Sequence, residues 1–298
     1  MNGIICINKP SGWTSFDVVA KVRGITQTRK VGHAGTLDPM ATGVLPLFFG
    51  TATKVCDIMP NSTKGYLAKF RLGMTTDTLD ITGTVLKNEP SHASREQLEQ
   101  VLDEFRGTIS QLPPMYSAVQ VNGRRLYDIA RSGETVERKP RQVTVSRLML
   151  RDFDEQTQEG ELEVLCSKGT YIRSLCSDIG DKLGCGAVLT ALIRHCSGDF
   201  TLQDCLTLEE LQQAADRGEL EHHLLPVEKV FECFPAIYLN RTQAAKFQNG
   251  VKLDLNRVRF QNAEGLHRVF DQNKAFLGLA SLNLKEMELK IEKMFKRD

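Results

Sequence analysis

A short stretch near the N-terminus, residues 31–43 (VGHAGTLDPMATG), places a histidine and an aspartate at a spacing that could support catalysis. His33 and Asp38 lie five residues apart, in a segment that also holds three glycines and one proline. Glycine permits a positive φ and close approach of a ligand to the main chain, and Pro39 restricts Asp38 to extended or turn geometry. A carboxylate in such a loop is a candidate for catalysis. A tight surface turn capped by Asp38 would have the same spacing, so the spacing alone leaves both interpretations open.

Four further short sequence blocks accompany this one along the chain. The five blocks are NKPSGWTS at 8–15, GHAGTLDPMATG at 32–43, TDTLDITG at 76–83, PPMYSA with GRRLY at 113–118 and 123–127, and SKGTYIRS at 167–174. Together they resemble the motifs of the TruB-type tRNA pseudouridine synthases. Five ordered motifs spread over residues 8–198 are far more specific than a single glycine-rich loop.

The resemblance implies an α+β architecture in two parts. The first is a pseudouridine-synthase fold, with a mixed, largely antiparallel sheet flanked by helices and loops, and the second is a small β-rich PUA-like domain. We expect the catalytic domain over residues 1–225, with an RNA-binding insertion at about 108–141, and the PUA-like RNA-binding domain over residues 226–298. The match in the second part is weaker and depends mainly on residues 243–250.

The resemblance also assigns catalytic roles. Asp38 matches the essential aspartate of the family, although the sequence leaves open whether it attacks the uracil ring or assists at C1′ of the ribose. Arg173 matches an arginine that would keep this carboxylate charged, since a guanidinium holds a carboxylate in a bidentate pair. A phosphate-binding or surface arginine is the alternative for Arg173. Tyr66 matches a tyrosine that stacks on the flipped base and takes part in the chemistry.

A second group of residues is expected to bind substrate. Tyr171 and Leu192 match positions that line the base pocket, and His33 matches a histidine that contacts the reorganised RNA loop. The three remaining candidates have weaker roles. Lys9 would support the catalytic loop, Lys54 would meet phosphate, and Asp80 would either hydrogen-bond near Tyr66 or hold a turn.

Three positions depart from the family pattern. Ile193 stands where an arginine is usual, Gln120 where a lysine is common, and Val188 where a histidine is frequent. All three departures weaken the expected contacts to the RNA backbone and leave the reaction class unchanged.

The net charge of +1 is low for an RNA-binding protein, because RNA affinity depends largely on phosphate neutralisation. The charge is, however, unevenly distributed along the chain. Residues 1–33 carry five basic residues against one acidic residue, and residues 121–150 carry seven against three. Residues 201–232 carry eight acidic residues against two basic ones. This asymmetry is consistent with one RNA-binding face, or with ordinary solvated charge.

The composition points away from several other classes of protein. No apolar run reaches the length of a membrane helix, and the N-terminus lacks the pattern of a signal peptide, so we expect a cytoplasmic protein. The eight cysteines form no C-x-x-C pair, which favours reduced and mostly buried thiols over a zinc site. The sequence contains neither a dinucleotide-binding nor a P-loop fingerprint. We therefore expect no metal and no cofactor.

The hydrophobic pattern predicts the elements that position these residues. Strands are expected at 4–7, 64–72 and 162–166, and the apolar stretch 44–50 should anchor the Asp38 loop. Helices are expected from Thr14 or Ser15 to about Arg23, from Ser94 to before Gly107, and over 171–183, 207–216 and 241–249. In the first helix, Phe16, Val19 and Val22 should face inward, and Gly24 should follow its end.

The predicted function is conversion of uridine to pseudouridine at position 55, in the T-loop of tRNA, as the resemblance implies. The expected partner is the T-arm of tRNA, and the protein is expected to be a monomer. Three alternatives remain: a non-catalytic tRNA-binding folding factor on the same fold, a metabolic enzyme that binds a small phosphorylated ligand, and a synthase that acts on another RNA. The first predicts a degraded active site and the second a phosphate-binding fingerprint.

Overall fold

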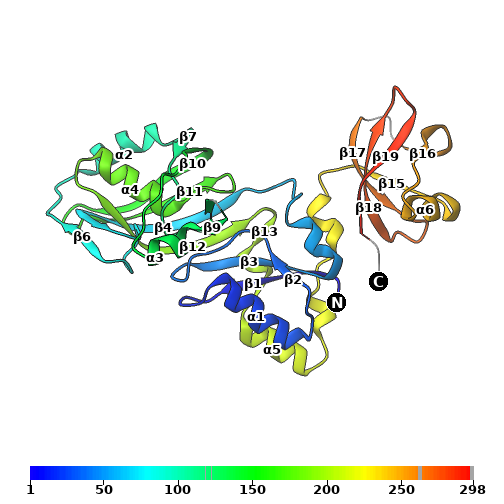
Figure 1. Ribbon diagram of the computed structural model, residues 1–298, viewed down its shortest axis with the longest axis horizontal. Coiled ribbons are helices and arrows are strands. Elements are labelled where there is room, and N and C mark those ends of the chain that lie inside the picture. Colours follow the sequence, from blue (N-terminus) through cyan, green and yellow to red (C-terminus); the bar gives the residue numbers. More distant parts are fainter. Residues whose placement is uncertain (118, 122, 261–263, 296–298) are drawn as a thin grey trace.

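The computed structural model describes residues 1–117, 119–121, 123–260 and 264–295, and it contains two separate main sheets (Figure 1). The larger, ten-stranded sheet consists of β1 (Gly3–Lys9), β2 (Val31–His33), β3 (Thr42–Phe49), β4 (Lys64–Leu72), β7 (Gly107–Gln111), β10 (Arg141–Asp154), β11 (Glu159–Cys166), β12 (Ala187–Ser197), β13 (Phe200–Thr201) and β14 (Cys205–Leu206). Its central order is β14-β1-β3-β12-β4-β11-β10-β7. Within the described strands of this sheet, the β1–β14 and β3–β12 pairs are parallel and the other pairs are antiparallel. The expected mixed, largely antiparallel sheet is confirmed.

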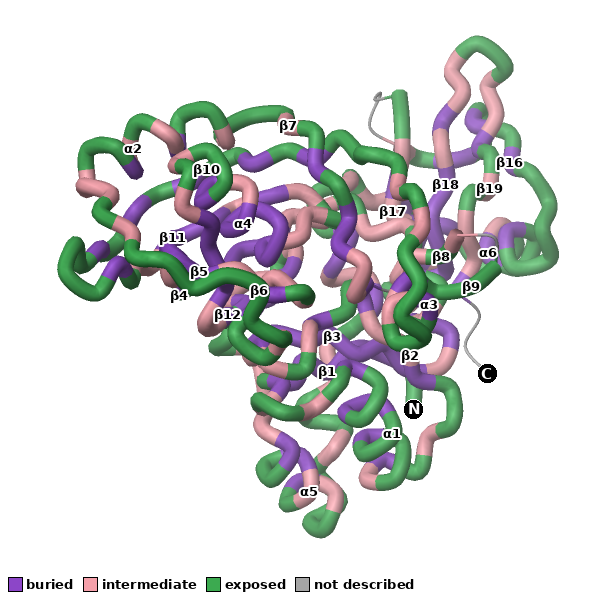
Figure 2. The backbone as a smooth tube through the Cα atoms, turned by 60° about the vertical axis from the view of Figure 1, so that its left-hand side comes forward, coloured by how far each residue is buried: buried purple, intermediate pink, exposed green. Residues whose placement is uncertain are grey.

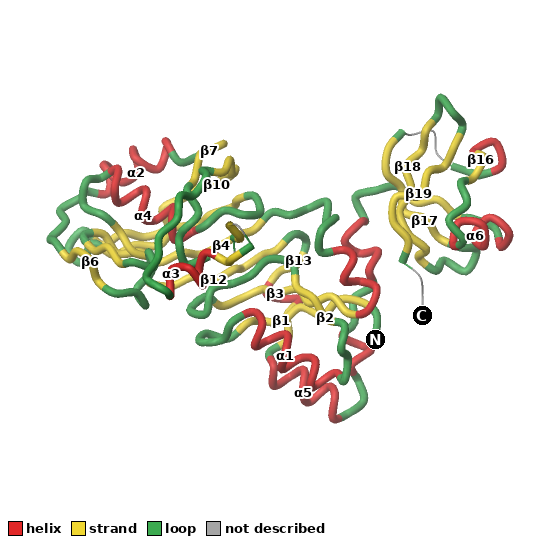
Figure 3. Tube along the Cα trace, in the orientation of Figure 1, coloured by secondary structure: helices red, strands yellow, loops and turns green. Residues whose placement is uncertain are grey.

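Helices cover the sheet in two groups (Figures 1 and 3). The helices of the catalytic part are α1 (Ser15–Thr26), α2 (Arg95–Glu104), α3 (Leu126–Arg131), α4 (Ile172–Lys182) and α5 (Leu208–Asp216). Helices α2 and α4 place Leu98, Leu102 and Leu175 in one core with the buried side chains of β4, β10 and β11. Helices α1 and α5 share a second core with β1 and β3. Leu37 and Ala41, on either side of Asp38 in the sequence, pack in the first of these cores.

Strand β3 is buried from Gly43 to Phe49 (purple in Figure 2). Its side chains alternate between two cores: Val44 and Phe48 pack in one, and Leu45 and Leu47 pack in the other. A strand covered on both faces has a continuous apolar sequence, as residues 44–49 do. The prediction that this stretch anchors the Asp38 loop is confirmed, because β3 follows directly after the loop.

The second sheet forms the C-terminal part. It consists of β15 (Ala236–Tyr238), β16 (Leu253–Asp254), β17 (Gly265–Phe270), β18 (Phe276–Asn283) and β19 (Glu288–Met294), in the order β15-β17-β18-β19-β16, with α6 (Arg241–Gln248) beside it. The predicted set of short strands around one helix is therefore confirmed. Phe231, Phe276 and Phe295 pack in one hydrophobic cluster with Phe48 and Val55 of the catalytic part. Aromatic packing thus joins the two parts.

The structure corrects three details. Helix α1 continues to Thr26, so Gly24 lies inside it, and the N-cap is Thr14 with a capping box to Asp17. Phe16 is 62% exposed, because Val18 takes the inward position together with Val19 and Val22. The insertion is shorter than expected, because residues 107–111 form β7 and pair with β10 at the edge of the sheet.

Two short ribbons complete the catalytic part. They are β5 (Met74–Thr76) with β6 (Val85–Asn88), and β8 (Gln120–Val121) with β9 (Arg124–Arg125). The β8–β9 ribbon and α3 belong to the expected insertion. Ala118, the last residue of the PPMYSA block, lies outside the described residues.

Gly43 sits where two strands approach closely, and this gives a prediction about stability. A Cβ at Gly43 would lie 2.2 Å from the Arg194 carbonyl oxygen of β12, and the φ of Gly43 is +106°. We expect Gly43→Ala to lower the free energy of unfolding by about 2–4 kcal/mol, through backbone strain and overpacking. Chemical denaturation followed by circular dichroism measures this.

Gly107→Ala is the matched control. Gly107 also has a positive φ, +83°, but a Cβ there meets nothing within 4 Å. This variant should lose only about 1 kcal/mol, from backbone strain alone. If both variants lose the same free energy of unfolding, the close approach of Gly43 to Arg194 is not the cause of the loss.

Candidate active site

Asp38 lies in the loop between β2 and β3, and several buried contacts fix this loop. The Asp38 carbonyl accepts a hydrogen bond from the Ala41 N–H at 3.1 Å, which closes a turn around Pro39. The Leu37 N–H donates to Ser15 Oγ of α1 at 2.8 Å. The Lys9 Nζ donates to the carbonyl oxygens of Pro10, Trp13 and Pro39 at 2.9, 2.5 and 3.1 Å. The loop is thus tied to α1 and to the end of β1.

Arg173 reaches the Asp38 carboxylate from the first turn of α4. Its Nη2 donates to Asp38 Oδ1 at 3.0 Å, and its Nε lies 2.8 Å from Oδ2. In this two-point contact, Nη2 donates a hydrogen bond, and Nε makes a short ionic contact without hydrogen-bond geometry. The Arg173 side chain is 5% exposed, whereas that of Asp38 is 34% exposed. The carboxylate therefore faces open space while its partner is buried behind it.

The remaining donors of Arg173 fix its orientation. Nη1 donates to the Thr78 carbonyl at 2.9 Å, and Nη2 also donates to the Tyr116 carbonyl at 2.8 Å. Asp80 Oδ2 lies 3.7 Å from Nη1. Because these contacts come from three separate loops, Arg173 links the Asp38 loop, the 76–83 block and the 113–118 block at one point.

Burial and charge act in opposite directions on the Asp38 carboxyl. Burial raises its pKa above the ordinary value, and the Arg173 guanidinium opposes this rise. The pKa of the Tyr66 phenol is also raised, because the ring is buried, and the neighbouring Arg194 opposes that shift. Tyr66 is therefore held as the neutral phenol.

A pocket of about 260 Å³ opens beside the pair. Of the nine residues that the sequence suggests for the site, five line this pocket: Asp38, Tyr66, Tyr171, Arg173 and Leu192. They come from a loop, from β4, from the start of α4 and from β12. The sheet order places β4 next to β12, which brings Tyr66 and Leu192 together.

Tyr171 is placed by a reciprocal pair of hydrogen bonds with the end of β7. The Tyr171 N–H donates to Gln111 Oε1 at 2.7 Å, and Gln111 Nε2 donates to the Tyr171 carbonyl at 3.0 Å. Gln111 is 2% exposed. Since Tyr171 is the N-cap of α4, the same contact also fixes the helix that carries Arg173.

The other four predicted residues lie outside the pocket lining, and each has a different position. Lys9 is fully buried, and its ammonium donates to three backbone carbonyls, among them that of Pro39 in the Asp38 loop. Asp80 is 4% exposed and accepts from Thr78 Oγ1 and from both the N–H and Oγ1 of Thr82, so it holds a turn behind Arg173.

His33 and Lys54 lie further from the carboxylate. His33 ends β2, and its ring contacts Phe16 edge-on at 6.1 Å; burial lowers its pKa, which favours the neutral imidazole. Lys54 lies on the 3₁₀ helix η1 (Gly50–Val55), and its Nζ donates to the Met294 carbonyl of the C-terminal part at 3.2 Å. The structure thus places Lys54 at the contact between the two parts, away from the pocket.

The pocket also contains polar residues that the sequence analysis did not select. Lys64 and Arg194 line it and are 7% and 1% exposed, and Ser117 lines it at 5% exposure. The Ser117 Oγ has no hydrogen-bond partner among the described residues. Strand alternation could have indicated the first two, since Lys64 lies two residues before Tyr66 and Arg194 two residues after Leu192. Nothing local indicated Ser117 beyond its place in the PPMYSA block.

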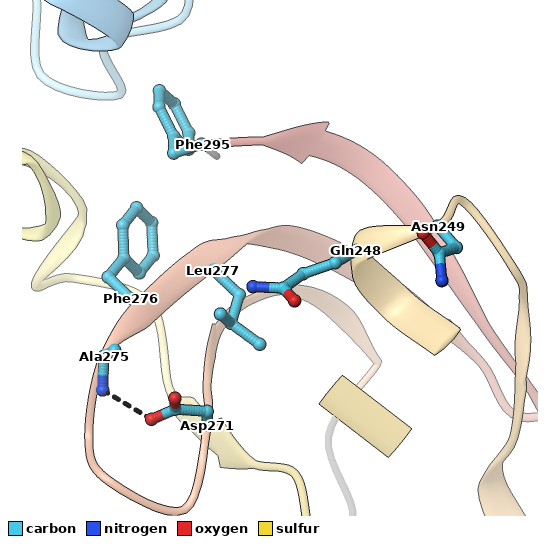
Figure 4. Close-up of a pocket in the computed structure, with 7 residues that line it drawn as sticks. All are labelled: Gln248, Asn249, Asp271, Ala275, Phe276, Leu277 and Phe295. Atoms are coloured by element: carbon cyan, nitrogen blue, oxygen red, sulfur yellow. Dashed lines mark hydrogen bonds between the residues drawn. The ribbon is translucent and has the colours of Figure 1, made fainter. Parts of the chain in front are cut away.

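A second pocket, of about 370 Å³, lies in the C-terminal part (Figure 4). Among its described lining residues, Asp271 is the one ionisable side chain. Its carboxylate accepts from the N–H groups of Asn273 and Ala275 at 2.8 Å each and so shapes its own turn. This pocket lacks a paired set of reactive groups, and the Asp38 pocket is the candidate active site.

The described residues show neither a membrane-crossing helix nor a metal-binding cluster. Within them, no helix is long and apolar enough to span a bilayer. No group of three or more His, Cys, Asp and Glu side chains in that part of the chain could hold a metal ion. All eight cysteines are free, but only Cys6, Cys166 and Cys176 are buried, so the expectation of mostly buried thiols is too strong.

Comparison with known proteins covers nearly the whole chain. Residues 23–172 match the family described as TruB family pseudouridylate synthase (N terminal domain). Residues 173–232 match the tRNA pseudouridylate synthase B C-terminal domain, and residues 235–287 match the C-terminal domain of pseudouridine synthase II TruB.

Individual relatives agree with these matches. The chain is 43% identical to a protein named tRNA pseudouridine synthase B from Clostridium perfringens, over 99% of both chains. It is 43% identical to the protein of the same name from Pseudomonas fluorescens, over 95% of this chain and 92% of the other.

Two solved structures share the fold. One is a Cbf5–Nop10–Gar1 complex, with a TM-score of 0.74, 26% identity, and coverage of 99% of this chain and 85% of the other. The other is an H/ACA RNP bound to a substrate RNA containing 2'-deoxyuridine, with a TM-score of 0.73, 25% identity and the same coverage. The sequence matches, the shared fold and the assembled pocket lead to one conclusion: the chain belongs to the TruB family of pseudouridylate synthases.

Proposed function

We propose that this protein isomerises uridine to pseudouridine in tRNA, at position 55 of the T-loop. The observation that carries the proposal is the Asp38 carboxylate, which faces the pocket while Arg173 holds it from behind. The names of the relatives support tRNA as the substrate. The reaction breaks the bond from C1′ to N1 of uracil, turns the ring, and forms a bond from C1′ to C5. The C5 proton is released and N1 gains a proton, so the product is an isomer of the substrate.

The pocket supplies what this reaction requires. The Asp38 carboxylate would provide the charge beside ribose and base, and Arg173 favours its ionised form against the effect of burial. A uridine inside a folded loop must leave its stack to enter such a pocket, which costs a few kcal/mol. The Tyr66 and Tyr171 rings and the Leu192 side chain offer the apolar contact that offsets this cost.

Exposed basic residues beside the pocket support a role for the insertion in RNA binding. Arg124 and Arg125 are exposed on β9, and the Arg131 guanidinium lies over the Tyr127 ring at 5.5 Å. The insertion is joined to the site through the Tyr116 carbonyl, which accepts from Arg173. RNA bound along the insertion would therefore lie close to the pocket.

The principal alternative is a non-catalytic RNA-folding factor on the same fold. Such a protein has no need of a paired carboxylate and guanidinium at the base of a pocket. The two-point Asp38–Arg173 contact therefore favours catalysis.

Three further predictions belong with this proposal. We propose residues 1–225 as the catalytic domain and 226–298 as an RNA-binding domain. The described residues of one chain supply the whole pocket lining, which supports a monomer. A tRNA substrate supports the prediction that the enzyme acts in the cytoplasm.

Asp38→Asn tests the reaction. This substitution keeps the shape of the side chain and removes its charge, so we expect turnover to fall by at least roughly 10⁴-fold, the order found when an essential reacting group is removed. The measurement is tritium release from a tRNA transcript labelled with 5-³H-uridine. Replacing the target T-loop uridine should also abolish release.

Asp17→Asn provides the matched control, since Asp17 is an exposed capping carboxylate on α1. It should keep wild-type turnover. No tritium release from the wild type, despite intact tRNA binding, would instead support the folding-factor alternative.

Arg173→Lys tests the geometry of the ion pair. Lysine keeps the charge but cannot make the two-point contact, so the carboxylate becomes mispositioned and its pKa rises further. We expect kcat to fall about 100-fold, and the acidic limb of the pH–rate profile to move to higher pH. Arg95→Lys, at a position on α2 where the side chain is 42% exposed, should change neither kcat nor the pH–rate profile. An unchanged pH profile for Arg173→Lys would show that Arg173 does not control the ionisation of Asp38.

A further inference from the structure

Lys64 is a buried lysine in the active-site pocket that the reaction described above does not use. Its residue is 7% exposed, and its Nζ donates to Ser197 Oγ at 2.6 Å. Ser197 is a neutral partner, and no carboxylate lies within ion-pair distance of Lys64 among the described residues. Burying an ammonium without a counter-charge is unfavourable, so the arrangement calls for an anion from elsewhere.

Arg194 places a second buried cation beside Lys64. Its Nε donates to the Val44 carbonyl at 2.8 Å and its Nη2 to the Gly35 carbonyl at 3.1 Å, so backbone oxygens hold it in place. A Cβ on Gly35 would lie 3.5 Å from Arg194 Nη1 and 3.8 Å from Lys64 Nζ. The glycine therefore keeps space open over both cations.

The charges around the pocket do not balance. Four cationic side chains line it, Lys64, Lys168, Arg173 and Arg194, against the single carboxylate of Asp38. Arg173 is paired with Asp38, which leaves three cations in the lining without a carboxylate partner among the described lining residues. Burial, followed by Arg194, lowers the pKa of Lys64 to about 8. The other groups that face Lys64 are Lys168 and the thiols of Cys166 and Cys196.

The position of these cations matches the backbone of a flipped nucleotide. Lys64 and Tyr66 share one face of β4, two residues and thus roughly 7 Å apart along the strand. This is comparable to the span from a base to the phosphate of its own nucleotide. Lys168 is exposed at the rim, where a strand of RNA would enter from solvent.

We propose that Lys64 and Arg194, with Lys168 at the rim, form a subsite for the phosphodiester that flanks the flipped uridine. This proposal rests on the proposed function, since it takes RNA as the ligand. A phosphate carries a full negative charge and stays connected to the rest of the RNA outside the pocket, which agrees with the open side at Lys168. The subsite would hold the backbone while Tyr66 contacts the base.

The test combines a substitution of Lys64 with RNAs in which one phosphate has been made neutral. Stem-loop RNAs of the T-arm are made with one methylphosphonate, either 5′ or 3′ of the target uridine, and their affinity is measured by fluorescence anisotropy. We expect Lys64→Met to weaken binding of the unmodified RNA roughly 10- to 100-fold, and to reduce the salt dependence by about one phosphate contact. For one of the two methylphosphonate RNAs, Lys64→Met should hardly change the affinity, because the phosphate that Lys64 binds is already neutral.

Lys69→Met is the control, because Lys69 is exposed on the opposite face of the same strand. It should bind all three RNAs like the wild type. An equal Lys64→Met loss on all three RNAs would overturn the proposal, as would a loss of kcat at unchanged affinity, which would place Lys64 on the uracil. Lys168→Met gives the same test at an exposed position where folding is not at risk.

The pH dependence of binding provides a second readout. A bound phosphate favours protonated Lys64, so wild-type affinity should fall as the pH rises through about 8. Lys64→Arg keeps its charge and should lose this pH dependence. If the affinities of the wild type and of Lys64→Arg change equally with pH, Lys64 is not the titrating group. All of these measurements report binding, so they decide the subsite even if the wild type releases no tritium.

Discussion

The ion pair between Asp38 and Arg173 is the interaction on which the rest of the site depends. Burial raises the pKa of the carboxyl, and a protonated Asp38 could not provide negative charge to a nucleotide. The two-point contact with Arg173 opposes that shift and also fixes the direction in which the carboxylate faces. The Thr78 and Tyr116 carbonyls hold Arg173 in turn, and Asp80 lies behind it. The ion pair is therefore the point at which separate loops of the catalytic part are joined.

A second constraint is the rigidity of the Asp38 loop. The Lys9 ammonium donates to the Pro39 carbonyl of the loop and to the carbonyls of Pro10 and Trp13, all inside the protein. Ser15 fixes Leu37 from α1, and Arg194 binds the Gly35 carbonyl from β12. Arg194 has two roles: it binds the Gly35 carbonyl of the loop, and it also lines the pocket.

The charges that line the pocket do not balance. Asp38 and Arg173 pair with each other, whereas Lys64, Arg194 and Lys168 have no carboxylate partner among the described lining residues. The pocket therefore carries an excess of positive charge, which suits an anionic ligand such as RNA. The departures at Ile193, Gln120 and Val188 lie outside the pocket lining.

The sequence by itself determined the local elements and the family. The capping boxes at Ser94 and Thr207, the alternation over 64–72 and the motif around Asp38 are local patterns, because each depends on neighbours a few residues apart. Tertiary structure decided which residues meet. Arg173 lies 135 residues from Asp38 and reaches it only because α4 packs on the sheet. Lys64 and Arg194 meet because β4 pairs with β12, and Phe16 faces solvent because Val18 fills the core below α1. Such contacts follow from strand order and packing, which no local spacing specifies.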